Sequence, residues 1–371
     1  GLKGSFSLAA RYLLRAKSYS IVGVPRGLIS SDELVETFIE AEKCELVVPK
    51  SAEATPYWRF ERAKTLSSPA YGILRLSGGT ATHLGGNLHE TGRLITTFLQ
   101  PVDGKPFHRH DLFRFSTSRF FPKVLEIDEP VVSLTAGWQD AFYHWIYEVL
   151  PRFAILEKAG IAGGLKIYID QGKRFQRESL NMLGIDTKQI IDASQFQGVR
   201  AKELIIPSIP IAPVQWVCEF LRDRLGRDLP QKAPLRLYIS RADAEKRRVR
   251  NELELDPILE KHGFQKVEMS RLPFREQAAC FASAEIVVGP HGAAFAHLAF
   301  CRPGTPILEI FDPAYTHLCY WQIANGATLR YHFLFGEGER YPDGFDPHID
   351  PDIEVDPKKF EEAILRALAD R

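Results

Sequence analysis

The sequence predicts an α/β protein built from two Rossmann-like domains. From residue 131 onward, short apolar runs alternate with longer segments of helical character, which is typical of parallel sheets covered on both faces. A polar, proline-containing stretch at residues 226–234 interrupts this alternation, and a second series of the same kind follows it. The length of 371 residues accommodates two domains of ordinary size.

The first half of the chain begins with weaker signals. Residues 29–50 are expected to form a helix, capped by Ser31 or Asp32, that leads into a strand. A helix is predicted from Asp140 to Gly160, and Pro151 should kink or split it because proline lacks the backbone donor. Strands are expected near residues 71–76, 93–99, 112–127, 131–137, 165–169, 189–193 and 203–208.

The second half shows a more regular alternation. Asp356 and Pro357 form a good N-cap and first-turn pair for a final helix over residues 357–370. Strands are predicted at residues 236–241, 264–269, 285–290, 306–311 and 329–335, with helices near 251–262, 273–283, 292–300 and 315–325. The predicted domains are residues 1–228, residues 229–350 and a terminal helix at 351–371 that packs back on the N-terminal domain.

The composition excludes several classes of protein. Lys+Arg and Asp+Glu both number 47, so the chain lacks the basic footprint of a nucleic-acid-binding protein. No apolar run reaches the length of a membrane span. The five cysteines are scattered and none forms a CxxC pair, which favours a reducing, cytoplasmic location. Residues 7–19 are amphipathic, which fits either peripheral association with the inner face of a membrane or ordinary packing.

The stretch VVGPHGAAFAHLAF at residues 287–300 is the first candidate site. His291 leaves a buried strand, and Gly292, Ala293 and Ala294 then open a helix. Small residues at a helix N-terminus let an anion approach the backbone N–H groups, and phosphate is the natural candidate. The spacing is neither GxGxxG nor a P-loop. The alternative is a tight turn with a capping histidine.

A basic loop at residues 241–250 is the second candidate. Arg241 comes directly off a buried strand, at the same sheet edge as His291, and Lys246, Arg247, Arg248 and Arg250 follow. Guanidinium groups bind phosphate through two parallel hydrogen bonds, although most members of such a run are solvated. Asn251 is expected to cap the next helix with Glu254 as its partner.

Glu309 is a carboxylate inside the apolar strand PILEIF. A buried carboxylate needs a partner. It could bind a ribose hydroxyl, as acidic residues do in Rossmann sites, or make a structural bond to an arginine or a loop N–H. The sequence leaves both alternatives open.

The helix predicted from Asp140 carries the catalytic candidates. Asp140, His144 and Glu148 are spaced four residues apart and would share one helix face among aromatic residues. His144 is the expected general base, oriented by Asp140 or Glu148, with Asp140 as the second choice of base. The alternative is a histidine that is satisfied within the core.

Other chemistries lack their motifs. No HxxxH, HExxH or CxxC pattern occurs, and His108-Arg109-His110 is expected to be a surface pair, so we predict no metal site. No GxSxG nucleophile elbow is present. An epimerase would need a dinucleotide glycine fingerprint, and a phosphatase a nucleophile or a metal cluster.

Four segments together resemble glycosyltransferase family 61, and in particular its bacterial members linked to capsule and other surface polysaccharides. They are FYHWIYEVLPRF, YISRADAEKRRVRNE, FREQAACFASAEIVVGPHGAAFAHLAF and PILEI, in that order, and the resemblance covers roughly residues 131–336. It implies a GT-B architecture, in which two Rossmann-like domains face a cleft. In the second half the matching positions are Arg241, Arg248, Asn251, Glu252, Gln277, His291, Gly292, Ala293 and Glu309, and in the first half they are His144, Glu148, Pro151 and Arg152.

The resemblance implies inverting sugar transfer from a nucleotide-sugar donor, with no cofactor and no required metal. The acceptor would be a glycan or a lipid-linked glycan. The second-half residues would bind the donor, and the first-half residues would line the cleft. A catalytically silent nucleotide- or sugar-binding protein on the same scaffold remains the competing hypothesis. The sequence leaves open the donor base, the sugar, the acceptor, the oligomeric state and any extension before residue 1.

Overall fold

The computed structural model of the protein describes residues 28–51, 57–98, 124–161, 163–196, 198–340 and 351–370. Residues 7–19 and 108–110, and most of the strand predicted at 112–127, lie outside these ranges. In the described part of the chain, no helix is both long and apolar enough to cross a membrane.

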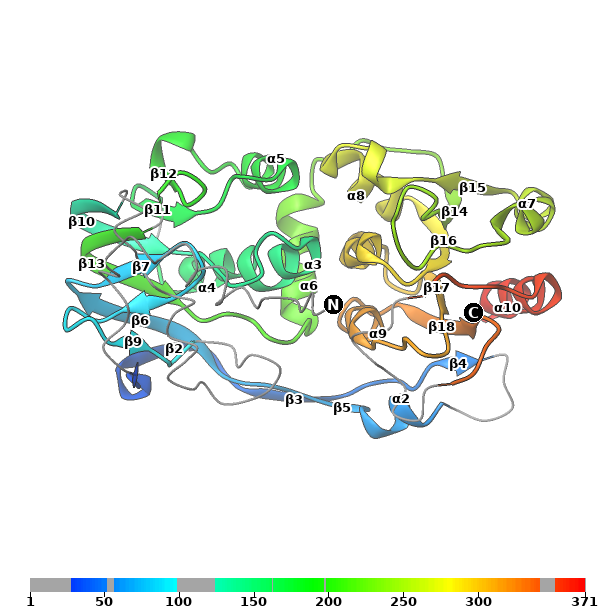
Figure 1. Ribbon diagram of the computed structural model, residues 1–371, viewed down its shortest axis with the longest axis horizontal. Coiled ribbons are helices and arrows are strands. Elements are labelled where there is room, and N and C mark those ends of the chain that lie inside the picture. The colour runs from blue at the N-terminus through cyan, green and yellow to red at the C-terminus, as the bar shows by residue number, and fades with distance from the viewer. Residues whose placement is uncertain are drawn as a thin grey trace, which may run out of the picture. The chain divides into compact units, whose positions relative to one another are not determined.

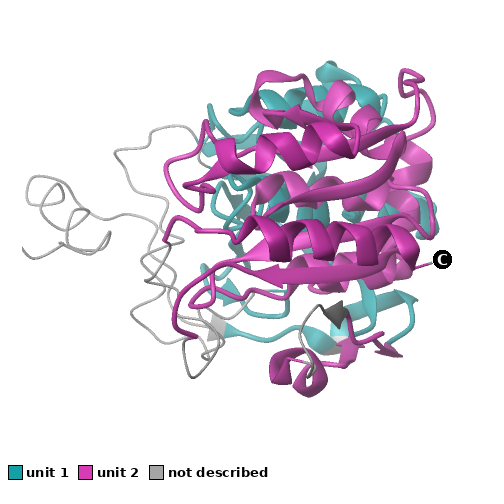
Figure 2. Ribbon diagram, turned by 90° about the vertical axis from the view of Figure 1, so that its right-hand side faces the viewer, with its two compact units in different colours: residues 1–41, 69–210 teal, residues 42–68, 211–371 magenta. Residues whose placement is uncertain are grey.

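The chain forms two compact units (Figure 2). Unit 1 comprises residues 1–41 and 69–210, and unit 2 comprises residues 42–68 and 211–371. The boundary therefore lies at residue 210 rather than 228, and an early segment belongs with the C-terminal half. This segment is held within unit 2 because the indole of Trp321 donates to the carbonyl of Val47 at 2.8 Å. Phe60, which is fully buried, packs edge-on against the same indole.

Unit 1 is built on a mixed sheet. The parallel strands run β12-β11-β10-β13, which is the order 3-2-1-4 of a Rossmann half, and β6 and β7 pair antiparallel with β13. The strands are β1 (Leu28–Ile29), β2 (Val35–Ile39), β6 (Tyr71–Ser77), β7 (Thr80–Thr82), β8 (Asn87–Leu88), β9 (Leu94–Ile95), β10 (Val124–Ser133), β11 (Lys166–Ile169), β12 (Ile190–Asp192) and β13 (Gly198–Pro207). The helices are η2 (Asp32–Leu34), α3 (Phe142–His144), η4 (Trp145–Val149), α4 (Arg152–Lys158), α5 (Arg174–Met182) and η5 (Thr187–Gln189).

The helix predicted after residue 31 is wrong. Only Asp32–Leu34 are helical, and β2 follows and pairs antiparallel with β6. The β-branched residues Val35, Thr37 and Ile39 alternate along β2. This alternation, together with the partner strand 36 residues further along the chain, outweighs the capping signal at Ser31 and Asp32.

Unit 2 is a Rossmann-like layer in which all strands of the main sheet are parallel. Their order is β15-β14-β16-β17-β18-β4, that is 2-1-3-4-5 with one added edge strand. The strands are β14 (Leu235–Ile239), β15 (Phe264–Val267), β16 (Ala284–Pro290), β17 (Pro306–Phe311), β18 (Arg330–Phe335) and β4 (Lys50–Ser51), with β3 (Glu42–Glu45) and β5 (Thr65–Ser68) as a separate pair. The helices are α2 (Trp58–Arg62), α6 (Gln215–Leu225), α7 (Glu252–Lys261), η6 (Met269–Arg271), α8 (Phe274–Ala282), η7 (Ala293–Phe300), α9 (Cys319–Gly326) and α10 (Pro357–Ala369).

Helices cover both faces of the unit 2 sheet (Figure 1). α7 and α10 lie on one face, where Leu259, Phe360 and Ile364 join the core formed by Ile286 and Leu308 of the sheet. α8 and α9 lie on the other, and η7 packs against α6, α8 and α9. The terminal helix begins at Pro357 with Asp356 as N-cap, as predicted, and it packs on the core of unit 2. These two units confirm the predicted α/β class.

Candidate functional site

The carboxyl edge of the unit 2 sheet brings together the two features that the sequence placed there. β14 and β16 are neighbours at the point where the strand order reverses, and Arg241 and His291 follow their ends. Open α/β sheets bind ligands in the crevice at this switch point. The topology therefore assigns the candidate anion site to the rim between these two strands.

Arg241 lies directly against Gly292. A β-carbon at residue 292 would be 2.1 Å from Nη1 of Arg241, a distance that no real side chain tolerates. Nη2 donates to the carbonyl of Lys246 at 3.0 Å, which fixes the end of the guanidinium over the turn. The glycine has an extended backbone, so here it supplies room for the arginine rather than an unusual conformation. Ala293, the next residue, is exposed and opens the 3-10 helix η7.

His291 is held by a buried network of side chains that includes Glu309 and Tyr331. Nδ1 of His291 contacts Oε1 of Glu309, and the hydroxyl of Tyr331 donates to Oε2 of the same carboxyl group. Glu309 is fully buried and His291 is 4% exposed. Burial raises the pKa of Glu309 well above its usual range, while the bond from Tyr331 and the charge of Arg247 act in the opposite direction.

These contacts favour the structural interpretation of Glu309. Both of its oxygens contact side chains of the protein, which are the partners that a buried carboxylate needs. The partners differ from those expected, since they are a histidine and a tyrosine. The sequence did not identify Tyr331 as a partner of Glu309. Its place in an apolar strand that pairs with β17 is the one signal that could have indicated this role.

Aromatic rings surround the imidazole of His291. Phe311 stacks on it with ring centroids 5.5 Å apart, and the ring of Tyr320 lies 4.8 Å away. Tyr315 is 5.5 Å from the same ring and lies in the loop before α9. The helix predicted over residues 315–325 begins only at Cys319, and this leaves the loop beside the site.

Glu252 and Gln277 lie outside this cluster of contacts. The Glu252 carboxylate accepts bonds from the hydroxyls of Tyr238 at 3.1 Å and Ser240 at 2.9 Å, so it braces the end of β14. The side-chain amide of Gln277 donates to the carbonyl of Leu272 at 2.9 Å and closes the turn before α8.

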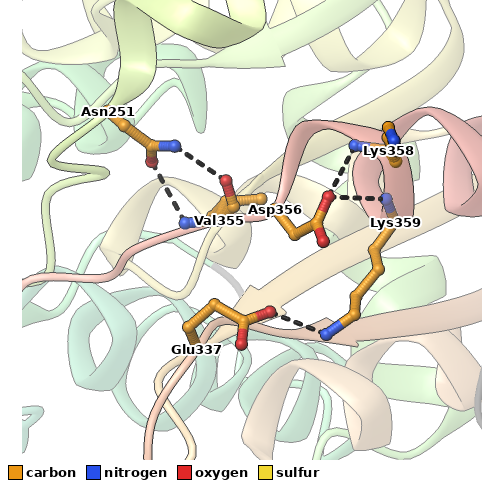
Figure 3. A network of polar contacts seen from close by, with 6 residues as sticks. All are labelled: Asn251, Glu337, Val355, Asp356, Lys358 and Lys359. Carbon is orange, nitrogen blue, oxygen red and sulfur yellow. Dashed lines mark hydrogen bonds and ion pairs between the residues drawn. The ribbon is translucent and has the colours of Figure 1, made fainter.

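Arg248 and Asn251 bind the segment that leads into α10. Arg248 forms an ion pair with Asp352 at 2.7 Å. Asn251 is the N-cap residue of α7, as predicted, but its side chain makes no capping bond. Its amide donates to the carbonyl of Val355 at 2.7 Å and accepts from the N–H of Val355 at 3.0 Å (Figure 3).

The candidate base of unit 1 is His144, at the end of α3. Its Nδ1 lies 2.6 Å from Oε1 of Glu148, and Glu148 is 8% exposed. The predicted effect of Pro151 is confirmed, because α3 widens into the π-helical turn η4 and a new helix begins at Arg152. π-helical turns occur frequently at functional sites. The geometry suits a histidine that accepts a proton while its other nitrogen is held by a carboxylate.

Asp140 does not share the helix face of His144. The helix begins at Phe142, so Asp140 lies in the preceding turn. A four-residue spacing places two side chains on one face only when both residues are helical, so it does not bring Asp140 next to His144. The carboxylate of Asp140 is instead a neighbour of Asp170. The pKa of Asp170 is raised, first by burial and further by the negative charges of Asp140 and Asp192.

Two other residues of this region have clear surroundings. Trp138 is 55% exposed, and its ring centroid lies 6.2 Å from that of His144. Arg152 is 1% exposed and donates to the carbonyls of Ser133, Thr135 and Pro207. Burial lowers the pKa of Arg152 to about 9. Its contacts make it a brace between the ends of β10 and β13.

Among the residues that the structure describes, no group of three or more His, Cys, Asp or Glu side chains is arranged to hold a metal ion.

Comparison with known proteins agrees with the motifs. Residues 142–308 match the family model described as Glycosyltransferase 61. The chain is 37% identical over 123 residues to an EGF domain-specific O-linked N-acetylglucosamine transferase of Drosophila melanogaster. The match covers 30% of this chain and only 22% of that protein. These two matches support the assignment of this region to glycosyltransferase family 61.

The chain is also similar to a solved structure. It is the bacterial iron-containing dodecameric glycosyltransferase TibC from enterotoxigenic E. coli H10407, with 10% identity and a TM-score of 0.33. The alignment covers 81% of this chain and 91% of that chain. A likeness at this level defines neither activity nor assembly.

Proposed function

We propose that this chain is an inverting glycosyltransferase that takes a sugar from a nucleotide-sugar donor and transfers it to a glycan or glycolipid acceptor. The single observation that carries the proposal is the packing of the Arg241 guanidinium on Gly292, at the switch point of a parallel sheet. This arrangement presents a cation beside a turn free of large side chains, where the diphosphate of a nucleotide sugar can approach the backbone.

The donor diphosphate is proposed to lie on unit 2. Arg241, His291 and the backbone N–H groups of Ala293 and Ala294 would stabilise the negative charge that develops as the nucleoside diphosphate leaves. Fixed cations and oriented N–H groups can supply this stabilisation by themselves, so we propose that transfer requires no metal. Glu309 acts through His291 in this scheme.

Acceptor activation is proposed for unit 1. The acceptor hydroxyl oxygen attacks the anomeric carbon from the face opposite the phosphate, and the bond between that carbon and the phosphate oxygen breaks. His144 takes the hydroxyl proton, and the nucleoside diphosphate leaves with the electron pair of the broken bond. The 2.6 Å contact with Glu148 supports this role because it orients the imidazole. One displacement of this kind inverts the anomeric configuration.

The biological setting is proposed on the resemblance to bacterial family members. The acceptor would be a glycan or lipid-linked glycan in surface polysaccharide synthesis, such as capsule, and the protein would act in the cytoplasm or at the inner face of the membrane. No nucleic-acid partner is proposed, because the charge of the chain is balanced.

Ligand binding tests the donor site. Purified protein is titrated with nucleoside diphosphates and nucleotide sugars, with and without a chelator, and the melting temperature is measured. We expect a shift of several degrees for one nucleotide that persists with the chelator and is lost in Arg241→Ala. The absence of a shift for every nucleotide would reject the proposal.

Turnover separates transfer from silent binding. The competing hypothesis, a nucleotide- or sugar-binding protein without activity, predicts the same thermal shift. Incubation of the best-binding nucleotide sugar with candidate acceptors, followed by measurement of released nucleoside diphosphate, distinguishes the two. Release that depends on the acceptor and is lost in His144→Ala supports the transferase.

A further inference from the structure

The basic loop after β14 separates its arginines into different environments. Arg241 lies on Gly292, Arg247 lies over the ring of Tyr315 with its guanidinium carbon 4.8 Å from the ring centroid, and Arg248 is paired with Asp352. The sequence presents Arg247 and Arg248 as adjacent and equivalent. The fold directs one toward the aromatic rings around His291 and the other toward the start of α10.

Arg247 has an unusual backbone conformation. Its φ is +56°, and Thr328 is the only other non-glycine residue with positive φ in the described part of the chain. A bulky residue in the left-handed region is strained, and such residues cluster where a side chain must be held for a ligand. The strain is therefore an independent reason to examine Arg247.

The following residues hold this conformation in place. Val249 forms a parallel bridge with Ile353, and the backbone of Ile353 bonds to Arg248 at 2.7 Å and to Arg250 at 2.8 Å. The side-chain amide of Asn251 makes two hydrogen bonds to the backbone of Val355, one through its nitrogen and one through its oxygen, next to the N-cap Asp356 (Figure 3). This two-stranded clamp, residues 248–251 with residues 352–355, fixes the chain immediately after Arg247.

The charge of Arg247 reaches the centre of the candidate donor site. It favours the ionised form of the buried Glu309, whose carboxyl contacts His291. Tyr315, over which Arg247 lies, is itself 5.5 Å from the His291 ring by centroids. Arg247 therefore belongs to the same electrostatic cluster as His291 and Glu309, whereas Arg248 is paired with the partly buried carboxylate of Asp352.

We infer that Arg247, rather than Arg248, is the second arginine of the donor diphosphate site, and that the clamp holds its side chain toward the ligand. The inference rests on the proposed function, since it assumes that a diphosphate binds at this rim. It differs from the expectation of the sequence, which selected Arg248. In this scheme Arg248 serves the clamp, and Arg241 and Arg247 bind the diphosphate.

The test uses the two adjacent arginines as a matched pair. Arg247→Asn removes the charge but keeps a residue that accepts the left-handed conformation, and Arg248→Asn removes a charge one position away. The full chain is titrated calorimetrically with inorganic pyrophosphate and with the nucleoside diphosphate that gives the largest thermal shift, at two salt concentrations. We expect Arg247→Asn to raise Kd at least tenfold and to weaken the salt dependence of binding. Arg248→Asn leaves the backbone bonds from residues 248 and 250 to Ile353 in place, so its Kd should rise clearly less than that of Arg247→Asn.

Further variants keep the result interpretable. Arg247→Lys should recover part of the affinity because the positive charge is retained, and the melting temperature without ligand should be unchanged in both Arg247 variants. Wild-type binding with an unaltered Kd in Arg247→Asn overturns this inference and leaves the proposed function intact. A loss of diphosphate affinity in Arg248→Asn as large as that in Arg247→Asn also overturns this inference. Wild type that binds no diphosphate overturns both.

Discussion

The guanidinium of Arg241 occupies the space that a side chain at residue 292 would fill, with Nη1 only 2.1 Å from the position of a β-carbon there. The two residues follow the ends of the neighbouring parallel strands β14 and β16, so the contact joins two loops at the switch point of the sheet. The sequence predicts that both residues lie at one edge of the sheet, but it does not show their contact, which joins positions 51 residues apart.

Gly292→Ala should weaken donor binding without unfolding the protein. The backbone at residue 292 is extended and accepts alanine, and the colliding atoms belong to the flexible end of Arg241, which can move aside. We expect the free energy of unfolding to change by less than about 1 kcal/mol. Nucleoside diphosphate affinity should fall roughly tenfold, the loss of one charge-assisted contact. Gly163→Ala, where the nearest atom would be 3.9 Å away, is the control and should keep wild-type affinity.

His144→Ala should reduce turnover far more than it reduces donor affinity. Loss of a general base typically costs roughly a hundredfold to ten-thousandfold in rate. Glu148→Gln should give a smaller loss, since it keeps the shape of the side chain that contacts Nδ1 but removes its charge. Steady-state kinetics with nucleotide release as the readout, together with direct titration of the donor, separate the two effects. Turnover of His144→Ala equal to that of wild type would show that the base lies elsewhere.

Glu309→Ala should destabilise unit 2 by about 3 kcal/mol or more, because it leaves two buried polar partners without their acceptor. The partners are His291 and the hydroxyl of Tyr331. Glu285→Ala, on the neighbouring strand with a half-exposed carboxylate, should have little effect. Denaturant unfolding of both variants checks this. A Glu309→Ala variant with normal stability and reduced nucleotide affinity would instead favour a direct ribose contact.

His297 should make the protein sensitive to mild acid. This histidine is fully buried among Phe274, Phe281 and Phe300, and burial lowers its pKa to about 4. The unfolded chain, with a histidine pKa of about 6.5, takes up the proton first as the pH falls. The stabilisation is therefore complete above about pH 6.5 and is lost between there and pH 4, by about 3 kcal/mol in total.

The test is to measure the free energy of unfolding as a function of pH for the wild type and for two histidine variants. His297→Phe keeps an aromatic ring in the cluster and should flatten the curve between pH 6.5 and 4. The exposed His317→Gln should keep the wild-type slope. An unchanged slope in His297→Phe would mean that other groups dominate the acid sensitivity.

The α/β alternation, most strands of unit 2, the break at Pro151 and the cap at Asp356 can all be predicted from the sequence. These depend on local signals, namely the period of apolar residues and the fixed geometry of proline. The sequence also places Arg241 and His291 at one edge, since parallel strands end on the same side of a sheet.

Which polar groups contact one another depends on the folded chain. The tertiary structure placed residues 42–68 in unit 2, took Asp140 off the helix of His144, and bound Glu309 to Tyr331. It also distinguished Arg247 from its neighbour Arg248, because a clamp formed with residues 352–355 sets the direction of each side chain. Such pairings join positions tens to hundreds of residues apart, and the free energy that selects them comes from packing and burial in the folded chain, which no local pattern encodes.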